Sequence, residues 1–302
     1  MSRAGVATGG LVALLVVDVV LVALALSPRS DSGDQGSVRI VESPTAPPSE
    51  TPPAESPSPT SEAPSVAAPL VRLLDASSAT QAWRLETGSC PDGGGSVQRT
   101  GDAGQTWADV AIEQDAFVRL KADGADEAFV VAVSDDGCTP VFFDTADGGT
   151  WSESAGSLSA AWYVEPVDRT AVHSPVGTQA GPCGADVVDL AAVTSDLAGL
   201  LCPDGRVFVT TDGAVSWEER VAVPGAVALS DAGDGFVVAV LGAQGCPGVQ
   251  VVAAGTGTAE ALGCADVSGE AGRLAISASG ESVWLWAGDE VRVSGDGGRT
   301  WG

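Results

Sequence analysis

Basic residues are scarce in this chain, and lysine is almost absent. The 302 residues include 14 lysines and arginines, of which only Lys121 is a lysine, against 40 aspartates and glutamates. The formal net charge is −26. A protein this acidic repels the phosphate backbone of nucleic acids, so the sequence predicts no nucleic-acid partner. Asparagine is also absent, so the chain contains no N-glycosylation sequon.

Residue types that commonly build active sites and metal centres are equally sparse. His173 is the single histidine and Tyr163 the single tyrosine. The sequence has no C-x-x-C, H-E-x-x-H or G-x-S-x-G motif and no Walker A loop. The acidic loops 134–137 and 231–235 lack the spacing of a calcium-binding loop and are interpreted as hairpin turns. The sequence therefore predicts no catalytic residue, no cofactor and no metal, and we expect a protein that is not an enzyme.

The N-terminal region contains one long apolar run. Residues 11–26 are apolar apart from Asp18 and come close to the roughly 20 residues that span a bilayer. The charges on either side favour a cytoplasmic N-terminus over residues 1–10 and a transmembrane signal anchor over 11–27. A cleaved signal peptide is the alternative, because residues 23–25 form a small-x-small site. Both interpretations place the rest of the chain outside the cytoplasm.

Two regions of different composition follow. Residues 28–68 are rich in Ser, Pro, Thr and Glu, a composition that cannot form a packed core, and are predicted to be a disordered linker. Residues 69–302 contain most of the Val, Trp and Gly and are predicted to be the folded domain. This domain carries 11 basic and 33 acidic side chains, so it is itself acidic.

The six cysteines all lie in the predicted folded domain. An even number of cysteines behind an export signal favours disulfide bonds. We predict sequential pairing, and free buried thiols remain the alternative. The predicted pairs are Cys90 with Cys138, Cys183 with Cys202, and Cys246 with Cys264.

One short segment recurs four times, at 100–107, 145–151, 210–217 and 294–301. The shared pattern is Ser/Thr-x-Asp-x-Gly-x-Thr/Ser-Trp, and a β-rich run precedes each copy. The Asp carboxylate can accept backbone N–H groups across a turn, and the Trp can bury a large apolar surface between sheets. These residues are predicted to build hairpin turns: Asp102, Gly104, Thr106, Trp107, Asp147, Gly149, Thr150, Trp151, Asp212, Ser216, Trp217, Asp296, Gly298, Thr300 and Trp301.

Two copies depart from the pattern. The second copy is one residue short, and the third has Ala214 where glycine is expected, so both turns are expected to be distorted. The four Asp residues are 45, 65 and 84 positions apart. The wider gaps suggest degenerate copies near 174 and 256, which would bring the spacing close to the roughly 40 residues of a four-stranded propeller blade.

The repeated segment resembles the Asp-box, or BNR repeat, of sialidase-like propellers. The domain also resembles Ycf48-type assembly factors and other Asp-box propellers of bacterial envelopes. This resemblance implies an all-β fold: a β-propeller of about six four-stranded blades, with five or seven blades as alternatives. In such a ring we expect the segment around residues 70–74 to supply the outer strand of the last blade.

The resemblance also implies a function. Propellers of the Ycf48 type are docking platforms, so we expect an interaction or scaffold module whose partner is an unknown protein or cell-wall component. The alternative is a glycan-binding protein or a sialidase-like glycoside hydrolase, in which Tyr163 and Glu165 would act together. Arginine and acidic side chains gathered with a tyrosine at the channel mouth would favour the enzyme. Exposed aromatic side chains around one face would favour the lectin.

Overall fold

The computed structural model describes residues 67–233 and 235–302. The predicted cytoplasmic N-terminus (1–10), transmembrane anchor (11–27) and nearly all of the predicted linker (28–68) lie outside the described residues. Within the described ranges, no helix has the length and apolar character needed to cross a membrane. Strands make up almost all of the regular structure, with one short 3-10 helix (Leu158–Ala160).

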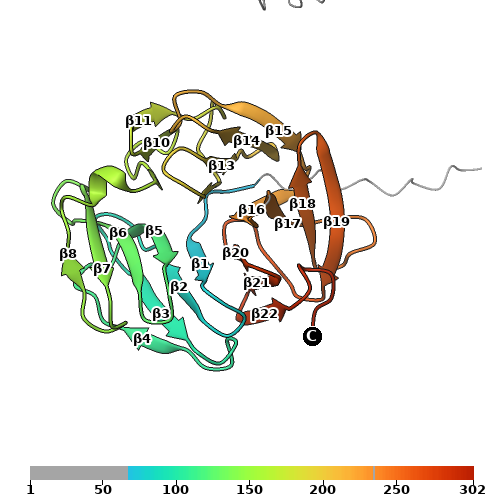
Figure 1. Ribbon diagram of the computed structural model, residues 1–302, viewed down its shortest axis with the longest axis horizontal. Helices are drawn as coiled ribbons and strands as arrows, with labels where there is room; N and C mark the ends of the chain where they lie inside the picture. Colours follow the sequence, from blue (N-terminus) through green and yellow to red (C-terminus); the bar gives the residue numbers. More distant parts are fainter. Residues whose placement is uncertain (1–66, 234) are drawn as a thin grey trace, which may run out of the picture. The chain divides into compact units, whose positions relative to one another are not determined.

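The strands form six antiparallel sheets arranged as the blades of a six-bladed β-propeller (Figure 1). Within each sheet, consecutive strands pair in chain order. Blade 1 contains β1 (Arg72–Ala76), β2 (Ala82–Glu86), β3 (Ser96–Thr100) and β4 (Ala108–Val110); blade 2 contains β5 (Phe117–Ala122), β6 (Ala128–Val133), β7 (Pro140–Thr145) and β8 (Ser152–Glu153); blade 3 contains β9 (Tyr163–Val164), β10 (Ala171–Ser174) and β11 (Gly177–Ala180).

The second half of the ring repeats this arrangement. Blade 4 contains β12 (Asp189–Ala192), β13 (Ala198–Leu201), β14 (Arg206–Thr210) and β15 (Glu218–Ala222); blade 5 contains β16 (Ala226–Asp231), β17 (Phe236–Val240), β18 (Val249–Gly255) and β19 (Thr258–Ala265); blade 6 contains β20 (Leu274–Ser279), β21 (Ser282–Ala287) and β22 (Glu290–Ser294). β1, β16 and β20, the first strands of their blades, lie near the centre of the ring (Figure 1), and residues of β5, β9 and β12 line the cavities there.

Blades 3 and 6 have three strands among the described residues, where the sequence predicted about six four-stranded blades with a short third blade. In blade 3, β11 leads directly into a segment that contains Gly181, Pro182 and the disulfide-bonded Cys183, and this segment has no apolar run to form another strand. The predicted degenerate copies near 174 and 256 fall in the β10–β11 and β18–β19 hairpins. The β18–β19 hairpin follows the third strand of its blade, as the four repeated turns do, whereas the β10–β11 hairpin joins the second and third strands of blade 3.

The repeated turns share one set of hydrogen bonds. Asp102 accepts from the Thr106 N–H at 2.9 Å and from the Thr106 hydroxyl at 2.6 Å, and the Thr100 hydroxyl donates to Asp102 at 2.7 Å. The Thr100 Oγ1 also accepts from the Gly104 N–H at 3.1 Å. Asp212 and Asp296 have equivalent bonds at 2.6–2.9 Å. Three of the four turns are therefore closed from inside by their own side chains.

The two unusual copies differ less than expected. In the third, Ala214 keeps the left-handed backbone, with φ of 72°, and its N–H still bonds to the Thr210 Oγ1 at 2.9 Å. The expected distortion is therefore wrong for this turn, which instead holds an alanine in a conformation that favours glycine. In the second, Asp147 accepts from the N–H groups of Gly149 and Thr150 at 2.9 and 2.7 Å, so the deletion shortens the turn and preserves the carboxylate's role.

Each repeated turn places its tryptophan against the preceding blade. Trp151 of blade 2 contacts Trp83 of blade 1 edge to face, with ring centroids 5.8 Å apart. Trp217 packs on the cluster that includes Trp162 of blade 3, and Trp107 packs against Trp284 and Trp286 of blade 6. The tryptophans therefore act as wedges between sheets, as the sequence predicted.

The ring closes in a way that the sequence did not predict. β1 pairs with β2 as the inner strand of blade 1 and does not add to blade 6, so the expected outer strand from residues 70–74 is wrong. Closure instead uses side chains and one backbone bond. The Trp284 indole N–H donates to the Ser78 carbonyl at 2.9 Å, the Ser277 Oγ accepts from the Ala76 N–H at 2.9 Å, and the Val71 N–H donates to the Gly272 carbonyl at 2.8 Å. The alternating pattern of β1 already suits an inner position, where Leu74 and Ala76 are buried.

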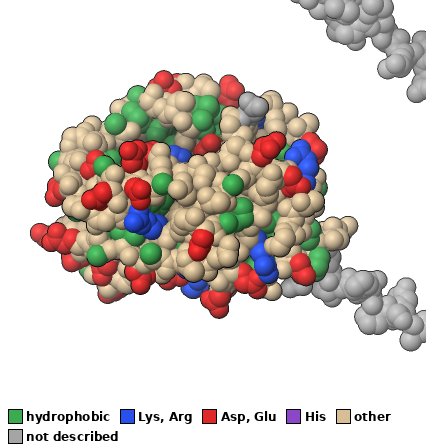
Figure 2. Space-filling model, turned by 60° about the horizontal axis from the view of Figure 1, so that its bottom comes forward, with side chains coloured by type: hydrophobic (Ala, Val, Ile, Leu, Met, Phe, Trp, Pro, Cys, Tyr) green, Lys and Arg blue, Asp and Glu red, His purple; other side chains and the backbone are tan. Residues whose placement is uncertain are grey.

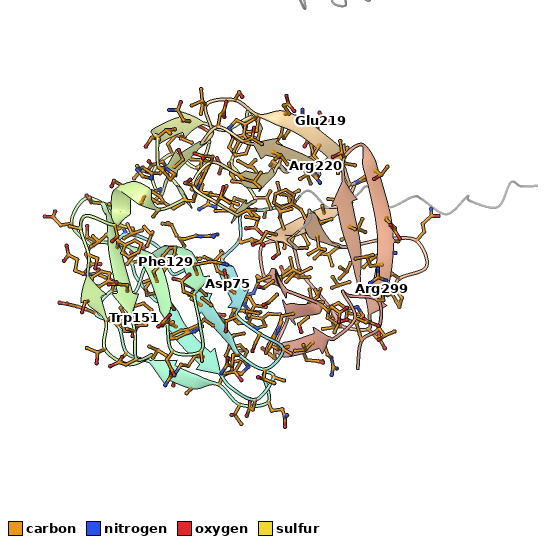
Figure 3. All side chains as sticks on the ribbon, viewed as in Figure 1. Asp75, Phe129, Trp151, Glu219, Arg220 and Arg299 are labelled. Carbon is orange, nitrogen blue, oxygen red and sulfur yellow. A yellow bond between two sulfur atoms is a disulfide. The ribbon has the colours of Figure 1, made fainter. Side chains whose placement is uncertain are left out.

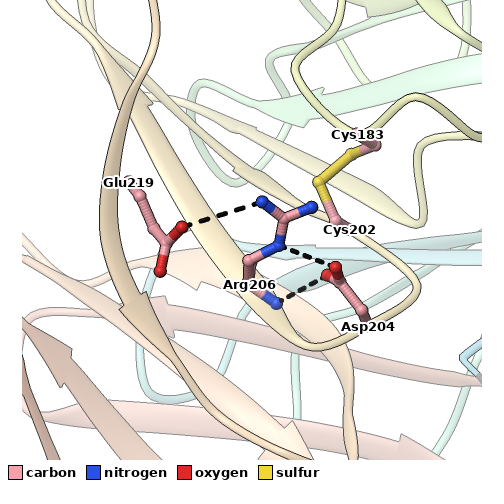
Figure 4. The surroundings of a disulfide bond; sticks show 5 residues. All are labelled: Cys183, Cys202, Asp204, Arg206 and Glu219. Carbon is pink, nitrogen blue, oxygen red and sulfur yellow. Dashed lines mark hydrogen bonds and ion pairs between the residues drawn. A yellow bond between two sulfur atoms is a disulfide. The ribbon is translucent and has the colours of Figure 1, made fainter.

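The three disulfide bonds confirm the predicted pairing. They join Cys90 to Cys138, Cys183 to Cys202, and Cys246 to Cys264, and no free cysteine remains among the described residues. The second bond ties the segment after β11 to the end of β13, beside the ion pairs of Arg206 with Asp204 and Glu219 (Figure 4). It therefore fastens the irregular part of blade 3 to blade 4.

The left-handed glycine of a repeated turn provides a test of this packing. Gly104 has φ of 79°, and an added Cβ would lie 3.1 Å from Val291 and 3.4 Å from Trp284. We predict that Gly104→Ala lowers the free energy of unfolding by about 1–2 kcal/mol, because alanine is disfavoured in the left-handed region. Urea unfolding measures this change. Gly101→Ala is the matched control, since nothing lies within 4 Å of its added Cβ, and equal stability of the two variants would contradict the prediction.

Candidate functional site

Charged side chains gather at the centre of the ring, on the inner strands of several blades. Asp75 lies on β1, Arg119 on β5, Asp189 on β12 and Asp231 on β16 (Figure 3 labels Asp75). Together with Ser230, Ser277 and several leucines they surround a cavity of about 40 Å³. A cavity of this size holds only a few water molecules.

Asp75 and Lys121 form the ion pair of this central site. Lys121 Nζ lies 3.3 Å from the Asp75 carboxylate, and the Asp75 side chain is only 14% exposed. Burial raises the pKa of Asp75 to about 6, although Lys121 and Arg119 act in the opposite direction. The only lysine of the protein thus partners a carboxylate that is half protonated near pH 6.

Asp189 is the second buried carboxylate of the central site. Its two oxygens accept from the N–H groups of Leu190 at 2.8 Å and Leu229 at 2.7 Å. Burial again raises the pKa to about 6 and outweighs these two hydrogen bonds. Asp189 therefore links the inner strand of blade 4 to that of blade 5, through Leu229 on β16.

Two arginines and the single tyrosine line a neighbouring cavity, also of about 40 Å³. Arg119 donates to the Leu190 carbonyl at 2.9 Å. The Nε atoms of Arg119 and Arg169 are buried without a hydrogen-bond partner among the described residues. These arginines and Tyr163 share the cavity with Asp189, so the combination named as a sign of an enzyme is partly present.

The surroundings of Tyr163 do not activate its hydroxyl. The ring stacks on His173, with centroids 4.5 Å apart, and burial raises the pKa of Tyr163 to about 12. The Glu165 carboxylate accepts from the Thr178 hydroxyl at 2.6 Å. His173 Nδ1 is 2.9 Å from the Ala161 carbonyl oxygen, so the ring connects β10 to the segment that leads into β9. A nucleophilic tyrosine would need a lowered pKa, so this arrangement is unlike an activated nucleophile.

Sequence reasoning singled out Tyr163 and His173 but missed the charges of the central site. Asp75, Arg119, Lys121 and Asp189 lie on three short strands, β1, β5 and β12, and are separated by up to 114 positions in the chain. Only the ring brings them together. A usable signal was present, because a charged residue inside a strand that is otherwise buried must find a partner or an internal cavity.

The other predicted residues lie elsewhere. The residues of the four repeated turns connect the third strand of a blade to the segment that follows, and bond to one another there. Within residues 67–233 and 235–302, no group of three or more His, Cys, Asp or Glu side chains is arranged to hold a metal ion.

Comparison with known proteins adds little beyond the fold. No family model matches the chain, and no curated protein matches it. Similar solved structures include YCF48 bound to a D1 peptide, at 17% identity over 80% of this chain and 69% of that one, with a TM-score of 0.31. The six-bladed lectin of Aleuria aurantia has 16% identity over 76% of this chain and 92% of that one, with a TM-score of 0.45.

A glycoside hydrolase is also among the similar structures. The GH74 xyloglucanase of Xanthomonas campestris has 15% identity over 77% of this chain and 37% of that one, with a TM-score of 0.30. The similar proteins thus include a lectin, a peptide-bound protein and an enzyme on related folds. Likeness at this level carries no information about activity or ligand.

The two raised carboxylate pKa values predict how stability depends on pH. Asp75 and Asp189 bind protons more tightly in the folded protein than in the unfolded chain. Their protonation therefore adds to the free energy of unfolding below pH 4, and this stabilisation is lost as the pH rises through about 6. The turn carboxylates act in the opposite sense, because hydrogen bonds from Thr106 lower the pKa of Asp102 to about 2. The stability that these turn carboxylates contribute is lost only as the pH falls below 4. We therefore predict a melting temperature that increases from pH 8 to pH 5.

The variant Asp75→Asn separates this effect from general charge repulsion. It removes one titrating group, so the increase in melting temperature between pH 8 and pH 5 should become smaller. Asp135→Asn, in an exposed loop, removes the same charge and should keep the wild-type dependence. Identical profiles for the two variants would contradict a role for Asp75.

Proposed function

We propose that this protein is a membrane-anchored, extracytoplasmic β-propeller that acts as a protein-interaction or scaffold module at a bacterial cell envelope. The apolar run at 11–27 and the proline-rich linker at 28–68 support the anchor and the distance from the membrane. Three disulfide bonds in one domain are typical of an oxidising compartment. The functional part of the domain is then an interaction surface, not a reaction centre.

The observation that carries this proposal is the small size of the two cavities at the centre of the ring. Each has about 40 Å³, and apolar and charged side chains fill the remaining space. Ligand pockets for small molecules are far larger, in the range of about 300–1,000 Å³. The interior of the ring therefore supports a structural role. An open pocket of about 340 Å³ at the ends of the inner strands, lined by Lys121, Asp123 and Asp231, and the outer surface, where acidic side chains far outnumber basic ones, are left for partners (Figure 2).

A glycan-acting enzyme is the second candidate, and one observation favours it. Arg119, Arg169, Asp189 and Tyr163 line one cavity, and an arginine cluster near a tyrosine is the arrangement expected of a sialidase-like site. The raised pKa of Tyr163 and the small cavity weigh against it. A lectin has less support, because the exposed large apolar side chains among the described residues are four valines and no aromatic residue.

Capture of partners tests the main proposal. The full-length chain, solubilised from envelope membranes with a C-terminal tag, should retain specific proteins, and it should stay with the membrane fraction after washing at high salt. A bait that carries only residues 1–66 is the control and should retain none of these partners. Equal capture by both baits, or recovery of the full chain as a soluble protein, would contradict the proposal.

A turnover assay tests the absence of enzyme activity. We expect the purified full-length chain to release no fluorophore from a 4-methylumbelliferyl sialoside beyond the rate in buffer, because Tyr163 is not activated. Tyr163→Phe should give the same result. Turnover by the wild type that disappears in Tyr163→Phe would establish the enzyme instead.

A further inference from the structure

Two buried guanidinium groups at the centre of the ring have donors without a protein partner. The Nε atoms of Arg119 and Arg169 are buried, and neither has a hydrogen-bond partner among residues 67–233 and 235–302. Both arginines line the same cavity of about 40 Å³. A buried charged donor that bonds to nothing is strongly destabilising, so the cavity between these arginines must supply them with an acceptor.

The two arginines approach this cavity from different blades. Arg119 lies on β5 of blade 2, and its Nη1 donates to the Leu190 carbonyl of blade 4 at 2.9 Å. Arg169 lies between β9 and β10 of blade 3, and its Nη2 donates to the Val187 carbonyl, just before β12, at 3.4 Å. The Val187 N–H donates in turn to the Arg169 carbonyl at 2.9 Å. Backbone groups at the start of blade 4 therefore hold both side chains in place.

No ion pair neutralises these arginines. Among the described residues, the ion pairs use other basic side chains and include neither Arg119 nor Arg169. Asp189 lines the same cavity, but each of its carboxylate oxygens already accepts a backbone N–H. One carboxylate also faces two guanidinium groups. The excess positive charge favours an anion in the cavity over a neutral water molecule.

The other polar side chains of the cavity are compatible with an anion. Burial raises the pKa of Tyr163 to about 12, so at neutral pH its hydroxyl keeps the proton and can donate it in a hydrogen bond. The Thr87 hydroxyl donates to the Gly88 carbonyl at 3.3 Å. The remaining side chains that line the cavity are apolar. Two charged donors and one neutral donor in apolar surroundings form a site for a negative ion.

The volume of the cavity restricts the anion to a compact one. About 40 Å³ is room for a few water molecules, and a halide ion is only slightly larger than one of them. Sites for organic ligands are far larger, at about 300–1,000 Å³. A sugar carboxylate is therefore excluded by the size of the molecule that carries it. Chloride is the most abundant halide in biological fluids, which makes it the anion that fits both charge and volume.

We propose that the cavity lined by Arg119, Arg169 and Tyr163 is a site for one chloride ion, which joins blades 2 and 3 to blade 4. The chloride would accept from the Nε–H groups of both arginines. Blade 3 has three strands among the described residues, and β9 has only two residues, so a further contact would strengthen a weak part of the ring. The ion takes part in no reaction, and its site is independent of whether the outer surface binds partners.

The chloride dependence of the melting temperature tests this site. The full-length chain, in a neutral detergent, is melted while sodium chloride progressively replaces sodium gluconate at constant ionic strength. Gluconate has the same charge as chloride but is too large for the cavity. Once the site is mostly filled, each tenfold increase in chloride should raise the melting temperature by about 3–6 °C. Equal melting temperatures in the two salts would overturn the proposal.

The variant Arg169→Gln separates ion binding from a packing role of the arginine. It removes one of the two charges and keeps an amide donor, so the chloride dependence should disappear. Arg299→Gln is the matched control, because it removes the same charge from an exposed turn away from the centre of the ring (Figure 3), and it should keep the wild-type dependence. If Arg169→Gln melts at a lower temperature in both salts but keeps the full chloride dependence, Arg169 does not bind the ion and the proposal fails.

A direct measurement keeps the proposal testable if Arg169→Gln folds poorly. Crystals of the wild-type full-length chain grown in sodium bromide should give an anomalous scattering peak within hydrogen-bonding distance of both Nε atoms. Well-ordered arginines with only water between them would overturn the site.

Other anions distinguish a chloride site from the carboxylate site of a glycan-acting enzyme. Formate and N-acetylneuraminic acid each replace gluconate in the same melting experiment. We expect neither to stabilise the wild type as chloride does. A rise in melting temperature with N-acetylneuraminic acid but not with chloride would overturn the proposal in favour of the enzyme, and a rise with formate alone would overturn it in favour of a small carboxylate.

Discussion

The architecture depends on one local interaction, the bond between the turn aspartate and the backbone that follows it. In each of three turns, one carboxylate receives a hydroxyl from before the turn and both an N–H and a hydroxyl from after it. This closure fixes the direction in which the chain leaves the turn, and the tryptophan comes next. Each tryptophan then reaches the preceding sheet, so a local hydrogen-bond pattern sets the contact between blades.

The buried charges at the centre follow from the ring geometry. Six inner strands converge there, and their backbone and side chains leave space that apolar residues alone do not fill. Asp189 uses this space to join blade 4 to blade 5 through two N–H groups, and Asp75 pairs with Lys121 between blades 1 and 2. Burying such groups is unfavourable unless they are paired, which explains why both carboxylates hold protons more tightly than usual.

Sequence reasoning succeeded where the information is local. The Asp–Gly–Thr–Trp segments predicted the propeller, and their spacing predicted six blades, because each turn and its flanking strands lie within a few dozen residues. The cysteines paired in chain order for the same reason. Reasoning failed where contacts join distant residues: the inner position of β1 and the convergence of Asp75, Arg119 and Asp189 depend on the closed ring. No pattern within 40 residues records which strand completes that ring.

The seam between blades 1 and 6 is closed mainly by side chains. Blades 1 and 6 are joined without a shared sheet, through Trp107 and Trp284 and through Arg84, whose guanidinium lies between the rings of Trp107 and Trp286 at 4.1 and 4.7 Å. A backbone hydrogen bond from the Val71 N–H to the Gly272 carbonyl, at 2.8 Å, adds to these contacts beside the start of both inner strands. The hydrogen bonds of this seam join residues 201 and 206 positions apart, so the strength of the seam depends on the folded ring and not on any local sequence pattern.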